Sequence, residues 1–169
     1  MVSEFFDLEK KLSNQLVRLK ELGICAVKAE FEAEGTRTDE LLRLMEIARK
    51  ADLDVGLKIG GCEAVRDLIE SKQFGVEFII APMIETPYAL SKFIDAKNKV
   101  YSTEEQSNTE FLYNLETETA FKNRLSLFEK ATTDTGVNGV VFGRVDYAMS
   151  QNISREDINT SRITGAVET

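Results

Sequence analysis

Two carboxylates, Glu116 and Asp146, come shortly after apolar stretches that have the composition of buried strands, 110–115 and 139–143. In a parallel sheet wound with helices, consecutive strands lie side by side and point the same way. Residues at their carboxyl ends therefore meet at one rim of the sheet. Mg²⁺ is usually bound by one or two carboxylates and completes its octahedral shell with water and substrate. The pair therefore predicts a divalent-cation site.

Other charged residues also follow strand-like segments, namely Glu30, Glu32, Lys58, Glu85 and Arg144. Such residues are too costly to bury unpaired, so each must face solvent, a partner or a ligand. Gathered at one rim, they would form a cation site with an anion-binding complement. Taken singly, each can equally be a structural residue. The ion pairs expected in that case join Lys58 to Glu30 or Glu85, and Glu30 or Glu32 to Arg37 or Lys28.

The elements that must position these side chains alternate along the chain. Apolar residues three and four apart predict helices, and short apolar runs bounded by Gly or Pro predict strands. This alternation predicts an α/β fold with a parallel sheet. The segment 98–109 reads as a loop that could carry a short strand at 100–101, and 154–163 is weakly helical. Strands are expected near 24–31, 54–59, 76–84, 110–115 and 139–143, and helices near 5–22, 39–50, 63–72, 88–97 and between the last two strands.

The composition limits the class of protein. The chain of 169 residues is long enough for one domain, 1–169, with a real core. Its formal net charge of -8 opposes binding to nucleic acid or to anionic lipid. No apolar run approaches the length of a membrane-spanning helix. Cys25 and Cys62 lack the spacing of a metal site, so we expect buried free thiols, as in a cytoplasmic protein. The chain has no His, so acid-base chemistry must use other groups.

Four segments carry a resemblance to a known family. They are Leu57-Lys58-Ile59-Gly60-Gly61-Cys62-Glu63-Ala64, Ala81-Pro82-Met83-Ile84-Glu85-Thr86, Asn114-Leu115-Glu116-Thr117 and Phe142-Gly143-Arg144-Val145-Asp146. In order and approximate spacing, over about residues 20 to 150, they resemble the HpcH/HpaI aldolase/citrate lyase family of the phosphoenolpyruvate/pyruvate superfamily. No single motif is decisive, but four in register on successive strands make a fairly specific signal.

The resemblance implies a TIM barrel that binds Mg²⁺, Mn²⁺ or Co²⁺ and cleaves carbon–carbon bonds reversibly, as an aldehyde-lyase or oxo-acid-lyase does. The reaction would pass through the enolate of a small 2-keto acid or an acyl thioester. The family's metal ligands correspond to Glu116 and Asp146, the pair already selected on physical grounds. Lys58 stands where many members have an Arg that contacts the enolate oxygen. The amides near Gly143 and Arg144 stand where the substrate carboxylate binds.

Two departures from the family pattern leave alternatives open. Aldolases of the family use a His after an early strand, and the corresponding segment here, 30–33, has none. Glu32 could replace it through a metal-bound water, or the chain could be a catalytically silent binding or assembly domain. Phosphoryl transfer through a phosphohistidine is excluded by the lack of His. Five strands are also fewer than the eight of a TIM barrel. We therefore expect an incomplete barrel: a fragment, or a homo-oligomer in which another subunit covers the edges.

Overall fold

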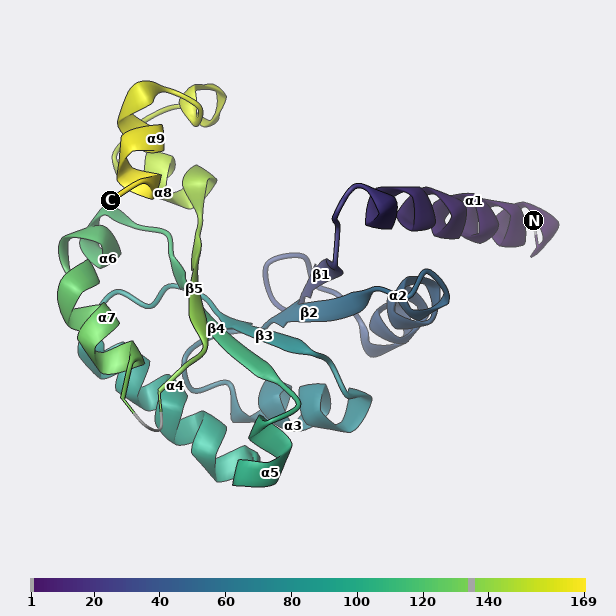
Figure 1. Ribbon diagram of the computed structural model, residues 1–169, viewed down its shortest axis with the longest axis horizontal. Coiled ribbons are helices and arrows are strands. Elements are labelled where there is room, and N and C mark those ends of the chain that lie inside the picture. The colour runs from purple at the N-terminus through teal and green to yellow at the C-terminus, as the bar shows by residue number, and fades with distance from the viewer. Residues whose placement is uncertain (1, 134–135) are drawn as a thin grey trace.

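The computed structural model describes residues 2–133 and 136–169 and contains one parallel sheet of five strands (Figure 1). The strands run in the order β1-β2-β3-β4-β5, and each pairs in parallel with the next along the chain. This confirms the α/β class and the five predicted strands. Their bounds are β1 Ala26–Glu30, β2 Asp54–Lys58, β3 Phe78–Ala81, β4 Glu110–Leu115 and β5 Gly139–Phe142.

One face of the sheet is apolar and packs against helices. Ala29, Leu57, Ile79 and Phe111 lie side by side across the first four strands and belong to the main hydrophobic core. Successive side chains of a strand point to opposite faces, so the residue after each of these points the other way. The sequence pattern thus separates a core face from a second, more polar face.

Four helices cover the core face in an arc (Figure 1). Each contributes fully buried side chains, such as Leu41, Leu68, Phe93 and Leu127, because its apolar residues recur at helical spacing. These helices are α2 Thr38–Lys50, α3 Val65–Phe74, α4 Pro87–Val100 and α7 Arg124–Ala131.

The second face carries the charged strand-end residues. Glu30 of β1 lies beside Lys58 of β2, which lies beside Ile80 of β3 and, one strand further, Leu112 of β4. Asn114 is two residues after Leu112 and therefore points to the same face. Glu30 and Lys58, together with Asn114, therefore lie on the face that the four core helices do not cover.

The first helix, α1 Val2–Glu21, was predicted at 5–22 and extends away from the sheet (Figure 1). It packs against α2 through the buried Leu16 and through an ion pair between Glu9 and Arg43. None of the helices within 2–133 and 136–169 is both long enough and apolar enough to cross a bilayer.

Several local expectations were wrong. Residues 100–101 form no strand, because Val100 is the last residue of α4 and Tyr101 ends that helix. The loop after it contains α5, Thr103–Gln106, which Ser102 caps by accepting a hydrogen bond from Glu105 N. The single helix expected after β4 is divided at Asn123 into α6, Glu118–Lys122, and α7.

The chain after β5 also differs in part from expectation. A helix α8, Arg144–Ser150, begins almost at once and was not predicted. The weakly helical segment becomes a short 3-10 turn at Arg155–Asp157 and α9, Ser161–Val167. Tyr147, Ala148 and Ile163 form a small second core there. Both cysteines are free, but neither is fully buried as expected: Cys62 is half-buried, and Cys25 is exposed because it lies just before the edge strand β1.

The sheet is open at both ends in the part of the chain that the structure describes, since β1 and β5 each pair on one side only. An apolar groove of about 520 Å³ lies along β5, and its lining includes Val140, Leu125 and Phe128, all exposed. Five parallel strands with an arc of helices on one face have the form of an incomplete barrel. Closed barrels have no such edges.

Candidate active site

Glu116 is the centre of the site. It follows β4 directly and is only 2% exposed, although it is a carboxylate. The backbone N–H of Met83 donates to its Oε1 at 2.9 Å, and Asn114 Nδ2 donates to its Oε2 at 2.7 Å. Each oxygen thus has its own hydrogen-bond donor, and the carboxylate is held in one orientation. A buried anion needs such partners, because unpaired burial is costly.

Lys58 provides the positive charge of the site. Its ammonium lies 3.7 Å from Oε2 of Glu116 and 3.7 Å from Oε2 of Glu30, so one cation bridges two buried carboxylates. The expected pair with Glu30 is confirmed. The pair considered with Glu85 is not what the structure shows: Lys58 contacts Glu116 instead, and Glu85 Oε1 accepts from the Thr117 hydroxyl at 2.7 Å.

Glu30 has a second positive neighbour in Lys28, with which it forms an ion pair. Burial by itself would raise the pKa of Glu30. The hydrogen bond from Lys28 and the charges of Lys28 and Lys58 outweigh that effect and hold its pKa below the ordinary value. Glu30 therefore stays ionised. The pair considered between Glu30 and Lys28 is confirmed, whereas Arg37 pairs with Asp39 and Glu40.

Two backbone features make room for Glu116. Gly143 follows Phe142, the partner of Leu115, and so lies opposite Glu116. A Cβ on Gly143 would lie 2.5 Å from Glu116 Cβ and 2.9 Å from its Oε2, so any larger residue would collide with the carboxylate. Met83 has φ 52, a left-handed conformation that costs roughly 1–2 kcal/mol for a residue other than glycine. That conformation accompanies the hydrogen bond from the Met83 N–H to Glu116.

Asp146 lies at the same end of the sheet as Glu116. It is half-buried in the first turn of α8, three residues after Gly143. Neighbouring strands are about 4.8 Å apart, and three residues of helix rise about 4.5 Å. The strand spacing separates Glu116 from Gly143, and the helix rise separates Gly143 from Asp146. Together they put the backbones of Glu116 and Asp146 within roughly 10 Å of each other.

The predicted carboxylate-binding amides divide into two kinds. The N–H of Gly143 donates to Leu115 O at 3.1 Å and is occupied by the sheet. Arg144 is the first residue of α8, where backbone N–H groups have no partner within the helix. Its side chain donates to Asn159 Oδ1 at 3.2 Å.

Glu32 lies on the loop after β1 and is exposed. Its side chain is close to Gly60, where an added Cβ would come within 2.5 Å of Glu32 Cγ. Gly60 N donates to Asp67 Oδ2 at 2.7 Å. Burial, with a further contribution from the negative charge of Glu32, raises the pKa of Asp67. Glu32 therefore lies close to the carboxyl group of Asp67, a residue of α3 that Gly60 contacts just after β2.

Asn114 was missed as a functional residue in the sequence. Asn114 is only 6% exposed, and its Oδ1 has no hydrogen-bond partner among the described residues. A buried amide oxygen without a donor is unusual. Its position two residues before Glu116 was the available signal, because that spacing places both side chains on one face of the strand. The contribution of Met83, a backbone N–H, leaves no signal in residue type.

The donor set fits a hard cation of the Mg²⁺ class. Glu116, the nearby Asp146 and the Oδ1 of Asn114, which has no hydrogen-bond partner among the described residues, would supply oxygen ligands, and Mg²⁺ usually keeps several waters. Within the described residues, no cluster of three or more Asp, Glu, Cys or His side chains could hold a metal by itself. A cation here would therefore depend on water or on a bound substrate for the rest of its shell.

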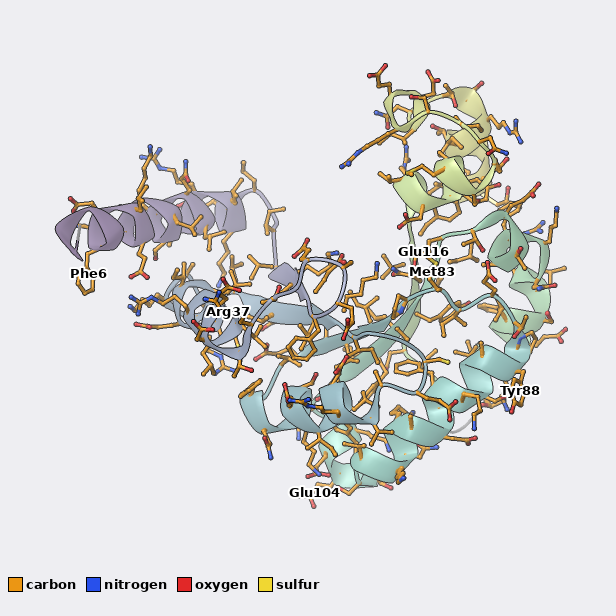
Figure 2. All side chains as sticks on the ribbon, turned by 180° about the vertical axis from the view of Figure 1, so that it is seen from behind. Phe6, Arg37, Met83, Tyr88, Glu104 and Glu116 are labelled. Carbon is orange, nitrogen blue, oxygen red and sulfur yellow. The ribbon has the colours of Figure 1, made fainter. Side chains whose placement is uncertain are left out.

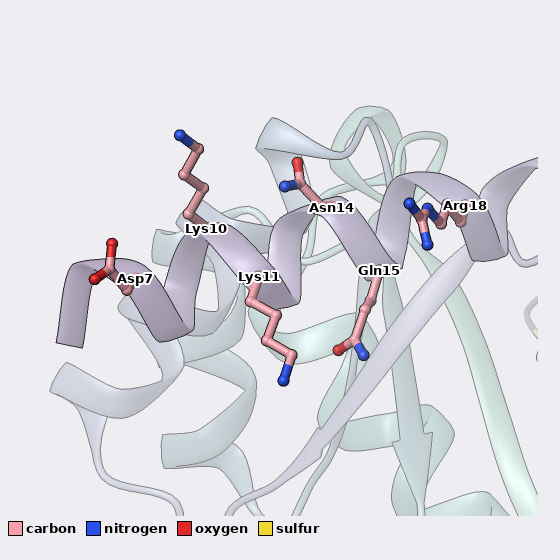
Figure 3. Close-up of a pocket in the computed structure, with 6 residues that line it drawn as sticks. All are labelled: Asp7, Lys10, Lys11, Asn14, Gln15 and Arg18. Atoms are coloured by element: carbon pink, nitrogen blue, oxygen red, sulfur yellow. The ribbon is translucent and has the colours of Figure 1, made fainter. Parts of the chain in front are cut away.

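One hollow of the surface lies far from these strand ends. It is a depression of about 370 Å³ on the surface of α1, and one helix supplies its whole lining (Figure 3). The residues are Asp7, Lys10, Lys11, Asn14, Gln15 and Arg18. It brings no second element to a ligand, and we assign it no role.

Comparison with known proteins identifies the fold. An HpcH/HpaI aldolase from Desulfitobacterium hafniense DCB-2 superposes with a TM-score of 0.69 at 14% identity, over 90% of this chain and 66% of that one. The citrate synthase SbnG gives 0.70 at 14% identity, over 92% and 66%. An HpcH/HpaI aldolase/citrate lyase family protein from Burkholderia cenocepacia J2315 gives 0.71 at 14% identity, over 92% and 69%.

Sequence comparison alone does not reach this result. No family model matches the chain, and no curated protein matches it. The chain spans about two thirds of the length of the solved structures that it resembles. Its five strands and their helices are therefore a large part of such a barrel, and the chain has the fold of the HpcH/HpaI aldolase/citrate lyase proteins.

Proposed function

We propose that this protein is a divalent-metal-dependent carbon–carbon lyase that acts on a small 2-keto acid or an acyl thioester through its enolate. The observation that carries the proposal is the buried Glu116 carboxylate, oriented by Met83 and Asn114 and placed 3.7 Å from the Lys58 ammonium. Solved structures with this fold include an aldolase and a citrate synthase, which fits a reaction of this class.

In this proposal, Glu116 and Asp146 would hold Mg²⁺, Mn²⁺ or Co²⁺. Bound there, the ion would act as a Lewis acid toward the keto oxygen of the substrate. Lys58 donates to the same oxygen as negative charge develops on it, and this contact strengthens toward the transition state. The backbone N–H groups at the start of α8, beginning with Arg144, would receive the substrate carboxylate.

Cleavage of a substrate that carries a hydroxyl group requires a base, because this hydroxyl group must lose its proton as the carbon–carbon bond breaks. The bonding electron pair passes to the enolate, and the enolate carbon then takes up a proton. We assign the base to Glu32, acting through a water molecule. Glu32 lies close to Gly60, which is two residues after Lys58, the last residue of β2. This position near the carboxyl end of β2 supports the assignment.

The test is exchange of the methyl protons of pyruvate for deuterium, followed by NMR. We expect exchange with Mg²⁺, Mn²⁺ or Co²⁺, loss of exchange with EDTA, and loss in Glu116→Gln, which has the same shape without the charge. Lack of exchange in the wild-type protein with every one of these ions would refute the proposal for 2-keto acids.

A second candidate is a catalytically silent binding or assembly domain. It is favoured by one observation: Lys58 and Lys28 already compensate the buried carboxylates without any added cation. Titration calorimetry separates the two candidates, because a lyase of the proposed kind must bind a divalent ion and a silent domain need not. Metal binding that disappears in Glu116→Gln would support the lyase.

A further inference from the structure

Met83 combines a left-handed backbone with a large exposed side chain. Three residues other than glycine have positive φ in the described chain, and two of them, Asp52 and Asn152, are of the types that tolerate it. Methionine is not such a type, because it has a Cβ that crowds the following carbonyl oxygen and lacks the short polar side chain with which Asp and Asn form a compensating local hydrogen bond. Its side chain is also 53% exposed, so burial in the core does not explain the residue either.

The backbone has a clear role at this position. It turns the Met83 N–H onto Glu116 Oε1 at 2.9 Å. Glycine would provide the same N–H without strain. What remains unexplained is therefore the methionine side chain, and strain of this kind is typically retained at ligand sites.

The hydrogen bond also fixes where that side chain begins. Backbone bonds are about 1.5 Å long, so Met83 Cβ lies within roughly 5.5 Å of Glu116 Oε1. Figure 2 shows Met83 beside Glu116. Among the described residues that hydrogen-bond or ion-pair with Glu116, which are Asn114, Lys58 and Met83, only Met83 has an apolar side chain. Its exposed side chain is therefore an apolar contact available to a ligand held at this carboxylate.

We propose that Met83 is a specificity-determining residue, whose thioether side chain packs on the carbon chain of a 2-keto acid beyond its keto group. The inference rests on the proposed function, in which the charged end of the ligand faces Glu116 and Lys58. The opposite end of such a ligand is apolar and must be removed from water by an apolar surface. Methionine suits this role, because its flexible side chain adapts to chains of different length.

The experiment compares pyruvate, 2-oxobutanoate and 2-oxopentanoate by deuterium exchange at C3 with Mg²⁺, in wild-type protein and three variants. Met83→Ala removes the side chain and keeps the left-handed strain. Met83→Gly removes both, and Met83→Leu keeps the apolar bulk. All three keep the N–H that contacts Glu116, and thermal unfolding verifies that each variant is folded.

We expect Met83→Ala and Met83→Gly to raise KM for 2-oxopentanoate relative to pyruvate by about fourfold per methylene that loses its contact. The kcat values should change less than about twofold, and Met83→Leu should restore the wild-type preference. Equal effects on all three acids, or no effect, would overturn this inference while leaving exchange by the wild-type protein intact. Failure of the wild-type protein to exchange any of the acids would instead overturn the proposed function and this inference with it.

Discussion

Replacement of Gly143 by alanine tests the geometry of the site most directly. The added Cβ would meet Glu116 Cβ at 2.5 Å and Oε2 at 2.9 Å, both shorter than contacts that real Cβ atoms make. Because Glu116 Cβ is attached directly to the backbone of a buried residue, a change of rotamer cannot relieve this contact. Either β5 must move away from β4 or Glu116 must leave its present position.

Overpacking of this kind costs typically about 1–3 kcal/mol. We therefore expect the free energy of unfolding of Gly143→Ala, measured by urea denaturation, to fall by about that amount. Displacement of Glu116 should also weaken Mg²⁺ binding in calorimetry by about tenfold or more, since about 1.4 kcal/mol of lost contact corresponds to a factor of ten.

The matched control is Gly165→Ala. Gly165 lies in α9, and nothing stands within 4 Å of an added Cβ. Alanine is better than glycine in a helix by about 1 kcal/mol, so this variant should be as stable as the wild type or slightly more stable. If Gly143→Ala unfolds at the same urea concentration as the control and binds Mg²⁺ normally, the close packing of Gly143 on Glu116 is refuted.

Three further predictions concern charges and edges. Lys58→Met should lower deuterium exchange at least tenfold while changing metal affinity less, because Lys58 contacts the developing oxyanion; undiminished turnover would remove Lys58 from the mechanism, and Lys58→Arg serves as the charge-preserving control. The pKa of Glu30 in the folded protein lies below 4.5, the ordinary pKa of a Glu side chain. Its ionised form therefore stabilises the fold at pH values above 4.5, and this stabilisation is lost as the pH falls through the lower pKa of the folded state. The difference in unfolding free energy between wild type and Glu30→Gln should accordingly shrink as pH falls below 4.5, and a difference independent of pH would contradict it. Finally, the unpaired β5 edge and its apolar groove should cause the isolated chain to associate, and a monodisperse monomer in light scattering would argue against this.

The sequence predicted the sheet better than its connections. Each strand was recognisable because residues such as Ile79 and Phe111 are apolar in short runs between breakers, and the structure places these runs in sequential order. The division of the helix at Asn123 was not recognisable. It depends on a tertiary contact, the Asn123 side chain donating to Glu85 O at 2.8 Å, which residue spacing does not reveal.

The candidate site was predictable where side-chain charge creates it. Glu116 and Lys58 stood out because charged residues after apolar strands need partners, and they contact each other in the structure. The role of Gly143 as a residue without a Cβ was not predictable, because it depends on register between β4 and β5. Asp146 was expected in a loop and lies in α8, whose seven residues are too few to show helical spacing.

The strand β3 explains why part of the site could not be read from residue types. The strands on either side of it supply charged or polar side chains, Lys58 from β2 and Asn114 from β4, to the uncovered face of the sheet. At the corresponding place β3 has the apolar Ile80, which lies beside Lys58. The chain that follows β3 contributes instead through its backbone, since the left-handed Met83 directs its N–H onto Glu116. A substitution at Met83 therefore leaves both the charges of the site and this N–H contact in place, and a comparison of charged residues alone would overlook how Glu116 is held.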